Sequence, residues 1–275
     1  MASLKGKVAV VTGASAGIGR ATALALARQG VDVVLGARRE ERLREVVDAV
    51  EAGGGRAIAL RTDVSQRPQV EALVGAAVER FGRLDVMISN AGFGYYGTVE
   101  ETPEEEFRRL LEVNLMGTFY GIQAALPVMR RQGSGHIVNV ASVVGRRAFP
   151  FHGPYAASKF AVVGLTEALR SELAGSGIVA TAVLPVGTRT EFFEVAPRPA
   201  GYPAGPLGIS QSPEKVAKVI VSCVRRPRAE VLLVPPMRLA LALAVLFPGL
   251  ADWVGGRYYR RLESRLTGAG TSGHT

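Results

Sequence analysis

Two side chains four residues apart, Tyr155 and Lys159, have the chemistry to move a proton together. They lie in the segment Gly153-Pro-Tyr-Ala-Ala-Ser-Lys-Phe, where a helix would place positions i and i+4 on one face. An ammonium group close to a phenol favours the phenolate and lowers a pKa that is otherwise about 10. The pair is therefore a candidate acid and base for a carbonyl or alcohol oxygen, although the same spacing also occurs on ordinary surface helices.

A glycine-rich turn near the start of the chain has the spacing of a phosphate-binding loop. The short apolar strand predicted for residues 7–12 leads into Gly13-Ala-Ser-Ala-Gly17-Ile-Gly19, and a helical run follows at once. Glycine lets the backbone come close to a pyrophosphate, which the free N–H groups of a helix N-terminus bind. This context predicts a dinucleotide site, and the alternative is a tight turn without a ligand.

The residues after the second predicted strand indicate which dinucleotide is bound. That strand, 31–36, is followed by Ala37, Arg38 and Arg39 rather than by an acid. An acid there would accept hydrogen bonds from the adenosine ribose 2′-hydroxyl, whereas an arginine matches the oxygens of a 2′-phosphate. The loop therefore predicts NADP as the cofactor. The alternative is that both arginines merely open the helix predicted at 40–51.

Length and patterning predict one α/β domain. The 275 residues are 48% hydrophobic, and short apolar runs alternate with helical stretches. Such alternation is typical of a doubly wound parallel sheet with helices on both faces. We expect helices at 17–29, 40–51, 68–81, 103–131, 154–175 and 213–225, and the apolar runs between them at 7–12, 31–36, 56–62, 84–89, 136–142 and 178–184.

Several motifs together resemble those of the short-chain dehydrogenase/reductase family, from about Lys5 to Val234. They occur in the family's order and spacing, and they are Thr12–Gly19, Asp63-Val64, Asn90-Ala91-Gly92, Asn114, Ser142 and Tyr155–Lys159. The resemblance implies a single Rossmann-fold domain. It also implies an oxidoreductase that transfers a hydride between a nicotinamide and a carbonyl or secondary alcohol.

The resemblance assigns a role to each site residue. Tyr155 would exchange the proton, and Lys159 would lower the pKa of that tyrosine and bind the nicotinamide ribose. Ser142 would hydrogen-bond the substrate oxygen, and Asn114 would hold a water in a proton relay that ends at the lysine. The remaining predicted cofactor contacts, the two arginines included, are Gly13, Ser15, Gly17, Ile18, Gly19, Arg38, Arg39, Asp63, Val64, Asn90, Ala91, Gly92, Thr188 and Thr190.

One departure from the family lies after the strand predicted at 178–184. The family usually has Pro-Gly there, whereas this chain has Pro185-Val186-Gly187, and valine cannot adopt positive φ cheaply. We expect either a displaced backbone or a transfer of the glycine's role to Gly187. The segment 189–212 that follows is rich in proline and glycine and is predicted to be the substrate loop.

Aromatic residues could give the substrate site an apolar wall. The candidates are Phe93, Tyr95, Tyr96, Phe149 and Phe151, and their alternative role is to fill the core or a subunit contact. Two other uses of the same site stay open at this point. One is epimerisation or dehydration without net redox change, and the other is a non-catalytic NADP-binding scaffold at a membrane.

Composition argues against several other classes of protein. Cys223 is the single cysteine, the three histidines are scattered, and no metal-ligand spacing is present, so no metal is expected. No zinc-finger, RNA-recognition or basic-zipper pattern is found, so nucleic acid is not an expected partner. The predicted strand begins too early for a secretory signal, which favours the cytoplasm.

The C-terminal part combines apolar and basic residues. Eight arginines and three acids between 225 and 265 give +5 of the net charge of +9, and nine apolar residues run from Leu239 to Phe247. That run is too short to span a bilayer, which takes roughly 20 residues. We divide the chain into a catalytic domain at 1–235, an extension at 236–265 and a disordered tail at 266–275. The extension is expected to mediate assembly into a homodimer or homotetramer, to cover the substrate cleft, or to contact a membrane peripherally.

Overall fold

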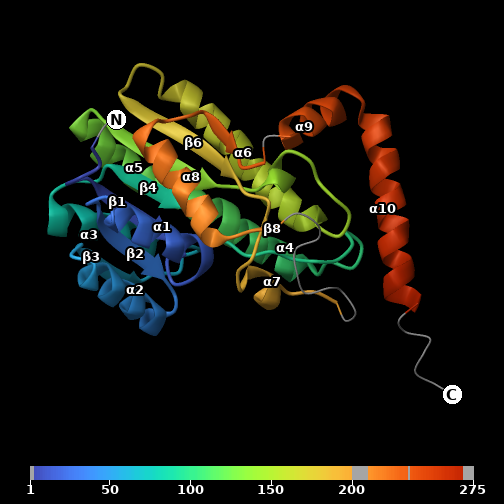
Figure 1. Cartoon of the computed structure of the whole chain (residues 1–275), viewed down its shortest axis with the longest axis horizontal. Coiled ribbons are helices and arrows are strands. Elements are labelled where there is room, and N and C mark those ends of the chain that lie inside the picture. Colours follow the sequence, from blue (N-terminus) through green and yellow to red (C-terminus); the bar gives the residue numbers. More distant parts are fainter. Residues whose placement is uncertain (1–2, 200–209, 235, 269–275) are drawn as a thin grey trace.

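The centre of the protein is a parallel sheet of seven strands (Figure 1). The computed structural model describes residues 3–199, 210–234 and 236–268. Strand order across the sheet is β3-β2-β1-β4-β5-β6-β9. The strands are β1 Val8–Thr12, β2 Asp32–Ala37, β3 Ala57–Arg61, β4 Val86–Ser89, β5 Gly135–Val140, β6 Ile178–Leu184 and β9 Glu230–Leu232.

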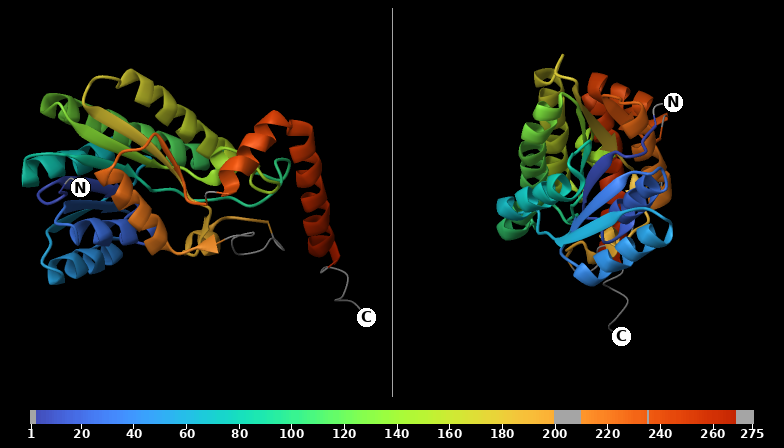
Figure 2. Two further views of the ribbon diagram at one scale, coloured as in Figure 1. Left: turned by 45° about the horizontal axis from the view of Figure 1, so that its top comes forward. Right: turned by 90° about the vertical axis from the view of Figure 1, so that its left-hand side faces the viewer.

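Helices bury both faces of this sheet (Figure 2). Every residue of β1 and β2 is buried, which explains why those strands are almost wholly apolar rather than alternating. One face is covered by α1 (Gly17–Ala27), α2 (Glu40–Ala52) and α8 (Pro213–Arg225). The other is covered by α3 (Arg67–Phe81), α5 (Gly117–Gln132) and α6 (Gly153–Glu172). The predicted doubly wound α/β fold is confirmed.

The strand order places a crevice beside β1. The chain proceeds from β1 to β2 and β3 on one side and then returns to β4 on the other. Loops that leave the carboxyl ends of β1 and β4 therefore diverge, and ligands of doubly wound sheets bind at such a switch point. The glycine-rich turn follows β1, and Asn90 follows β4 directly.

The predicted helix 103–131 is interrupted in the structure. It consists of α4 (Glu104–Leu110), a π-helical turn (Leu111–Met116) and α5. A π-helical turn inserts one residue into the helical register and often marks a functional position, and this one contains Asn114. The apolar pattern continues through the turn, which is why the sequence indicated one helix. Two further short strands, β7 (Gly187–Thr188) and β8 (Ser210–Gln211), pair with each other beside the main sheet.

The C-terminal part forms two helices that stand apart from the sheet (Figures 1 and 2). They are α9 (Pro236–Leu246) and α10 (Pro248–Gly268). Among the described residues no single helix is long and apolar enough to cross a membrane, although these two pass that test together with a bend of 114° between them. Helix α10 extends three residues into the tail predicted at 266–275, and residues 269–275 lie outside the described part of the chain.

An ion pair and a ring contact are among the interactions that attach α10 to the body of the protein. The Arg147 guanidinium donates to the Asp252 carboxylate at 2.6 Å, and the rings of Phe151 and Tyr259 stack with centroids 5.2 Å apart. Of the predicted substrate loop, 189–212, the structure contains α7 (Phe192–Val195) and β8, and residues 200–209 lie outside it.

A buried histidine in β5 makes stability depend on pH. The His136 ring is 5% exposed, its Nε2 lies 2.8 Å from Thr181 Oγ1, and its Nδ1 has no hydrogen-bond partner among the described residues. Burial, with a smaller effect from Lys7, lowers the pKa of His136 from 6.5 to about 4. Between pH 6.5 and 4 the histidine of the unfolded chain therefore binds a proton, whereas the His136 ring of the folded chain stays neutral. We expect the free energy of unfolding to fall by roughly 3 kcal/mol between pH 6.5 and 4.

Urea denaturation across that pH range measures this effect. His136→Gln removes the titrating group, so its stability should depend less steeply on pH than that of the parent protein. Burial also lowers the pKa of His152, so His152→Gln measures separately what a second buried histidine, outside the sheet, contributes to the pH dependence. Equal pH slopes for the parent and His136→Gln would show that other groups control acid stability.

Candidate active site

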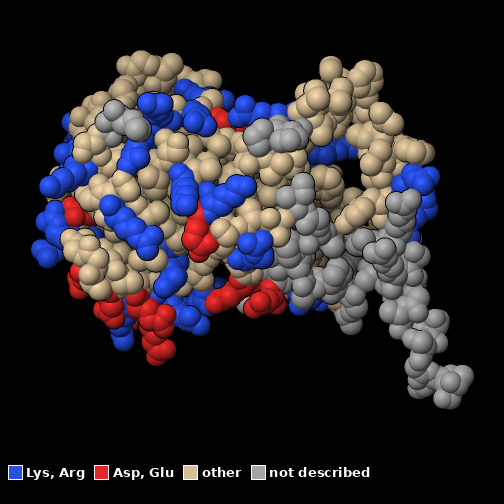
Figure 3. All heavy atoms as spheres, in the orientation of Figure 1, with Lys and Arg blue, Asp and Glu red and all other residues tan. Residues whose placement is uncertain are grey.

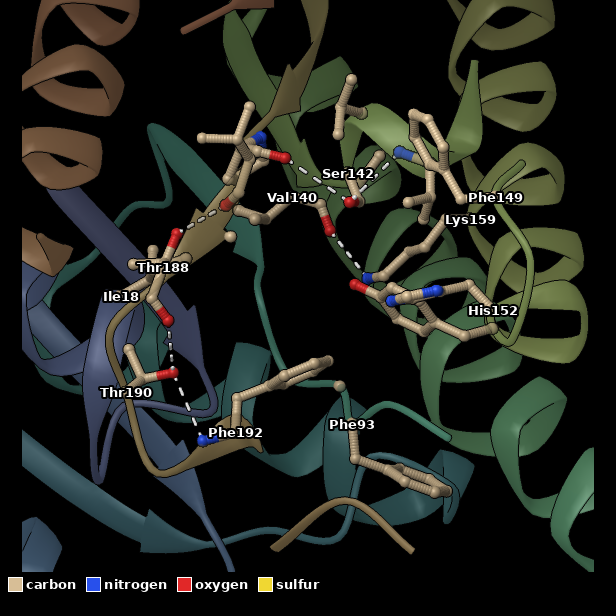
Figure 4. Close-up of a pocket in the computed structure, with 18 of the residues that line it drawn as sticks. Ile18, Phe93, Val140, Ser142, Phe149, His152, Lys159, Thr188, Thr190 and Phe192 are labelled. Atoms are coloured by element: carbon tan, nitrogen blue, oxygen red, sulfur yellow. Dashed lines mark hydrogen bonds between the residues drawn. The ribbon is translucent and has the colours of Figure 1, made fainter. Parts of the chain in front are cut away.

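A cavity of about 1100 Å³ opens at the carboxyl ends of the central strands (Figure 4). Its walls contain every predicted site residue except Gly19 and Asn114, which lie directly behind the lining. Residues that are far apart in the sequence, such as Gly13, Arg38, Ser142 and Thr190, thus face one space. The structure brings the predicted cofactor and catalytic residues together, whereas their individual roles remain predictions.

The turn after β1 has the shape of an anion cradle. Gly13 and Gly17 have φ of +66° and +52°, where other residues are strained. A Cβ at Gly13 would lie 2.8 Å from Ala91 Cα, and one at Gly17 would lie 2.9 Å from Thr190 Cγ2. The N-cap of α1, Ala16, supplies no side-chain acceptor, so the first N–H groups of the helix can bind a ligand. These features fit the pyrophosphate of a dinucleotide.

Hydrogen bonds fix the loops on either side of the switch point. Asn90 Nδ2 donates to Thr12 O at 2.9 Å, while Thr12 Oγ1 accepts from the backbone N–H groups of Asn90 and Ala91 at 3.0 and 3.1 Å. Gly19 completes this arrangement, because a Cβ there would overlap Gly13 O and Asn90 Nδ2. Asn90 and Gly19 therefore hold the cradle rigid from behind.

Three polar side chains lie together deeper in the cavity (Figure 4). Ser142 follows β5 and starts a short 3₁₀ turn, where its hydroxyl donates to Pro185 O and accepts from Val144 N, both at 3.4 Å. Tyr155 and Lys159 extend from α6, and Lys159 Nζ donates to Val140 O at 3.0 Å. The ammonium lies 5.8 Å from the centroid of the Tyr155 ring. The shared face inferred from the i, i+4 spacing is therefore present.

The expected lowering of the Tyr155 pKa is not produced by these side chains. Burial raises the pKa of the Tyr155 phenol above its usual value, and a hydrogen bond with Ser142 opposes this only in part. Burial also lowers the pKa of Lys159 to about 8. Desolvation is the largest cause of both shifts, because burial removes the charged form of each group from water. In the protein alone Tyr155 is therefore a neutral phenol at pH 7, the form that can donate a proton.

Asn114 positions this group from behind the cavity wall. It is fully buried, and its side-chain amide donates to Phe93 O and Ser158 Oγ and accepts from Phe93 N, each at 3.0 Å. Its backbone oxygen accepts a hydrogen bond from Thr118 Oγ1 at 2.8 Å. A Cβ on Gly92 would lie 2.8 Å from Asn114 Oδ1 and 3.4 Å from Lys159 Nζ, so only glycine fits between them. The amide joins the loop after β4 to α6.

Val186 causes no positive-φ strain in the segment after β6. It lies in ordinary backbone, since Phe151 is the single residue other than glycine with positive φ in the described ranges, and Gly187 has no positive φ either. The buried Val186 side chain packs with Val143 and Leu184. Thr188 Oγ1 donates to Val186 O at 2.9 Å, and Thr190 Oγ1 accepts from Phe192 N at 3.3 Å. Neither Val186 nor Gly187 has a positive φ, so the strain expected from valine at this position does not arise.

The two arginines after β2 differ in their surroundings. Arg39 is bound by Glu191, with Nη1 and Oε2 2.7 Å apart, and lies 3.4 Å from Ser15 Oγ. Arg38 lines the cavity and is exposed, and no hydrogen bond or ion pair engages it within the described ranges. Ala37, just before it, is buried. Arg38 is thus the arginine that is available to a ligand.

The substrate end of the cavity is mainly aromatic and aliphatic. Of the predicted aromatic wall, Phe93, Tyr96 and Phe149 line the cavity, whereas Tyr95 and Phe151 are buried outside it. The lining also includes Glu191 and Phe192 of the predicted substrate loop. Further lining residues were not individually predicted, and they include His152, Met237, Leu241 and Phe247. His152 could have been found, because it precedes Tyr155 by three residues at the start of the same helix. The C-terminal helices contribute to this lining, as in the expected role of covering the substrate cleft.

The pattern of the short chain dehydrogenase family matches residues 7–199. The chain is 42% identical over 229 residues to glycine betaine reductase ATRR of Emericella nidulans. The matched segment covers 82% of this chain but 18% of that much longer protein. Two solved structures are also similar. A short chain dehydrogenase/reductase from Burkholderia phymatum in complex with NAD shares 34% identity with a TM-score of 0.83, covering 91% of this chain and 97% of that one.

The second structure is an alcohol dehydrogenase from the archaeon Thermococcus sibiricus, complexed with 5-hydroxy-NADP. It shares 33% identity with a TM-score of 0.73, and the match covers 82% of this chain and 94% of that chain. The protein described here therefore belongs to the short-chain dehydrogenase/reductase family and is an oxidoreductase with a Rossmann fold. The resemblance inferred from its motifs is confirmed.

Proposed function

We propose that the protein is an NADP-dependent oxidoreductase that interconverts a carbonyl compound and a secondary alcohol. The observation that carries this proposal is the meeting of Ser142, Tyr155 and Lys159 with the glycine cradle in one cavity. The three polar side chains can hydrogen-bond a substrate oxygen and exchange a proton with it. The glycine cradle can bind the pyrophosphate of a dinucleotide.

The side chains define how a carbonyl would be reduced. The Ser142 and Tyr155 hydroxyls both hydrogen-bond the substrate oxygen and hold its carbon facing the cofactor side of the cavity. A bound nicotinamide supplies the hydride to that carbon. Tyr155 transfers its proton to the oxygen, which completes the alcohol, and the Lys159 ammonium stabilises the phenolate left behind. Oxidation of the alcohol is the same sequence reversed.

The cofactor preference rests on Arg38. Its free guanidinium beside the small, buried Ala37 supports an NADP 2′-phosphate rather than the bare hydroxyl of NAD. Arg39 supports it less directly, because Glu191 already neutralises that charge. The related structures contain one cofactor of each kind, so the local charge in this chain is the basis of the proposal.

An apolar substrate suits the remaining space. Phe149, Phe192, Met237 and Leu241 surround the part of the cavity beyond Ser142. A hydrophobic ketone would bury its carbon skeleton there while its oxygen reaches the hydroxyls.

The non-redox alternative uses the same residues, and the scaffold alternative does not need a complete catalytic group. Assembly as a homodimer or homotetramer, a cytoplasmic location, and the absence of a nucleic-acid partner remain predictions.

A panel of ketones and secondary alcohols, followed by the absorbance of NADPH, tests the proposed function. We expect oxidation of NADPH with hydrophobic ketones and incorporation of deuterium from 4-deuterated NADPH into the alcohol. A product that is an isomer or a dehydrated compound without the label would favour the non-redox alternative. NADPH binding without turnover of any substrate would favour the scaffold.

A further inference from the structure

An unusual concentration of exposed apolar side chains lies along α9 and α10. Of the thirteen large hydrophobic residues exposed in the described part of the chain, seven belong to this pair and an eighth, Phe247, joins the two helices. They include Val245 at 76% and Leu246 at 70% exposure. We call them the α9–α10 apolar surface, which consists of Leu239, Leu243, Val245, Leu246, Phe247, Leu250, Trp253 and Val254. Scattered hydrophobic residues are normal on a protein surface, whereas a contiguous patch marks an interaction site.

The same pair of helices also lines the catalytic cavity. Met237, Leu241 and Ala244 face its interior. Four residues belong to the α9–α10 apolar surface and also line the cavity, and each is at least 45% exposed: Leu243, Phe247, Leu250 and Val254. These four residues therefore form the rim of an opening that connects the α9–α10 apolar surface with the space beside Ser142 and Tyr155. Figure 3 shows this hollow between α10 and the body of the protein.

The charges beside the patch are positive. Arg238, Arg257 and Arg260 are exposed on the two helices, and Asp252, the single acid between 236 and 260, is paired with Arg147. The Arg257 guanidinium lies 5.3 Å from the centroid of the Trp253 ring. Arginine beside tryptophan at the border of an apolar surface is suited to lipid headgroups, where the ring rests in the interface and the cation meets phosphate.

We propose that the α9–α10 apolar surface docks on an anionic lipid bilayer and that a hydrophobic substrate enters the cavity from that bilayer. The part concerning the substrate rests on the proposed function, whereas the docking does not. With a bend of 114° between them, the two helices do not form one straight span. The bend places the apolar side chains at the boundary of headgroups and acyl chains. The substrate class that follows is a carbonyl or alcohol lipid.

A second copy of the chain fits this surface less well. In a symmetric dimer this positively charged surface would face its own copy, and the like charges of the two copies would repel. Such a dimer would also cover the rim formed by Leu243, Phe247, Leu250 and Val254, which is the apolar opening of the cavity. A bilayer satisfies both features, because it offers anionic headgroups and leaves a hydrophobic route to the site.

Trp253 is the only tryptophan of the chain, so its fluorescence reports on this surface alone. It is 58% exposed and does not line the cavity. We expect its emission to shift to shorter wavelength when vesicles of phosphatidylglycerol and phosphatidylcholine are added, and to be quenched when the acyl chains are brominated. Vesicles of phosphatidylcholine alone should bind more weakly, and added salt should weaken binding to the anionic vesicles.

A matched pair of variants localises the contact. Val245 and Val99 are both 76% exposed, neither lines the cavity, and only Val245 belongs to the α9–α10 apolar surface. Val245→Glu should weaken vesicle binding by at least about tenfold, because it removes an inserted side chain and adds a repelled charge. Val99→Glu should leave vesicle binding unchanged. Equal binding by parent and Val245→Glu would overturn the proposal, as would no vesicle binding by the parent.

Light scattering examines the competing occupant. Dissociation of an oligomer by Val245→Glu, without vesicle binding by the parent, would assign the surface to a second copy and overturn the proposal.

Activity tests the substrate route separately. Val245→Glu should reduce a water-soluble ketone as fast as the parent but should lose most of its rate with a ketone dissolved in the vesicles. Retention of both rates would overturn delivery from the bilayer. Inactivity toward every ketone, with vesicle binding intact, would refute the proposed function and not the docking.

Discussion

Tyr155→Phe is expected to lower kcat for ketone reduction by about 10²- to 10⁴-fold, the usual contribution of a positioned general acid. The phenol is held neutral by its burial and shares a hydrogen bond with Ser142, so it is prepared to give a proton to the substrate oxygen. Phenylalanine keeps the ring and its contact with Phe192, whose centroid lies 5.6 Å away, but has no proton to give. Single-turnover kinetics with NADPH in excess would measure the loss.

NADPH binding by the same variant separates chemistry from folding. The cradle at Gly13 and Gly17 lies on other elements, so fluorescence titration should show an affinity close to that of the parent. Tyr120→Phe is the control, because that phenol lies outside the cavity lining. The contact of its ring with the Arg67 guanidinium, 4.6 Å from the centroid, survives the change. If Tyr155→Phe kept a nearly normal kcat, another proton donor would have to be sought, and Tyr96 would be the first candidate in the cavity.

The fold was predictable because local pattern and global topology agree. Parallel strands buried on both faces must be apolar along their whole length, and β1 and β2 show this clearly. The helices between them begin or end at glycine and proline, such as Gly82 in left-handed conformation after α3 and Pro213 at the start of α8. The short strand β9 was missed because three residues carry too little pattern.

The site was predictable where its function depends on residue type and spacing. Gly13 and Gly17 need positive φ and close approach, requirements that are visible in a glycine pattern. Covering of the substrate cleft by the C-terminal extension was one of three expected roles, and the sequence could not select among them because the choice depends on how helices distant in sequence pack. The pKa of Tyr155 was mispredicted for a related reason, since spacing reports which charges are near but not how much water has been removed.

The double variant Ala37→Asp with Arg38→Ala is expected to shift the ratio of NADPH to NADH efficiency, in kcat/KM, by at least about 10²-fold toward NADH. Losing hydrogen bonds to a charged phosphate costs about 1.5–3 kcal/mol, or roughly 10- to 150-fold in binding. The new carboxylate would accept hydrogen bonds from the ribose hydroxyls of NADH and repel a 2′-phosphate. Initial rates with both cofactors at one ketone concentration would give the ratio.

Two single variants determine which cation is responsible. Arg38→Ala alone should account for most of the loss with NADPH, because this guanidinium has no competing partner among the described residues. Arg39→Ala should matter less, since Glu191 already holds that side chain. Arg42→Ala, on α2 and outside the cavity lining, controls for a general change in surface charge. If the parent itself preferred NADH, the interpretation of this loop would be wrong while the chemistry assigned to Tyr155 would stand, because the 2′-position is remote from the reacting carbon.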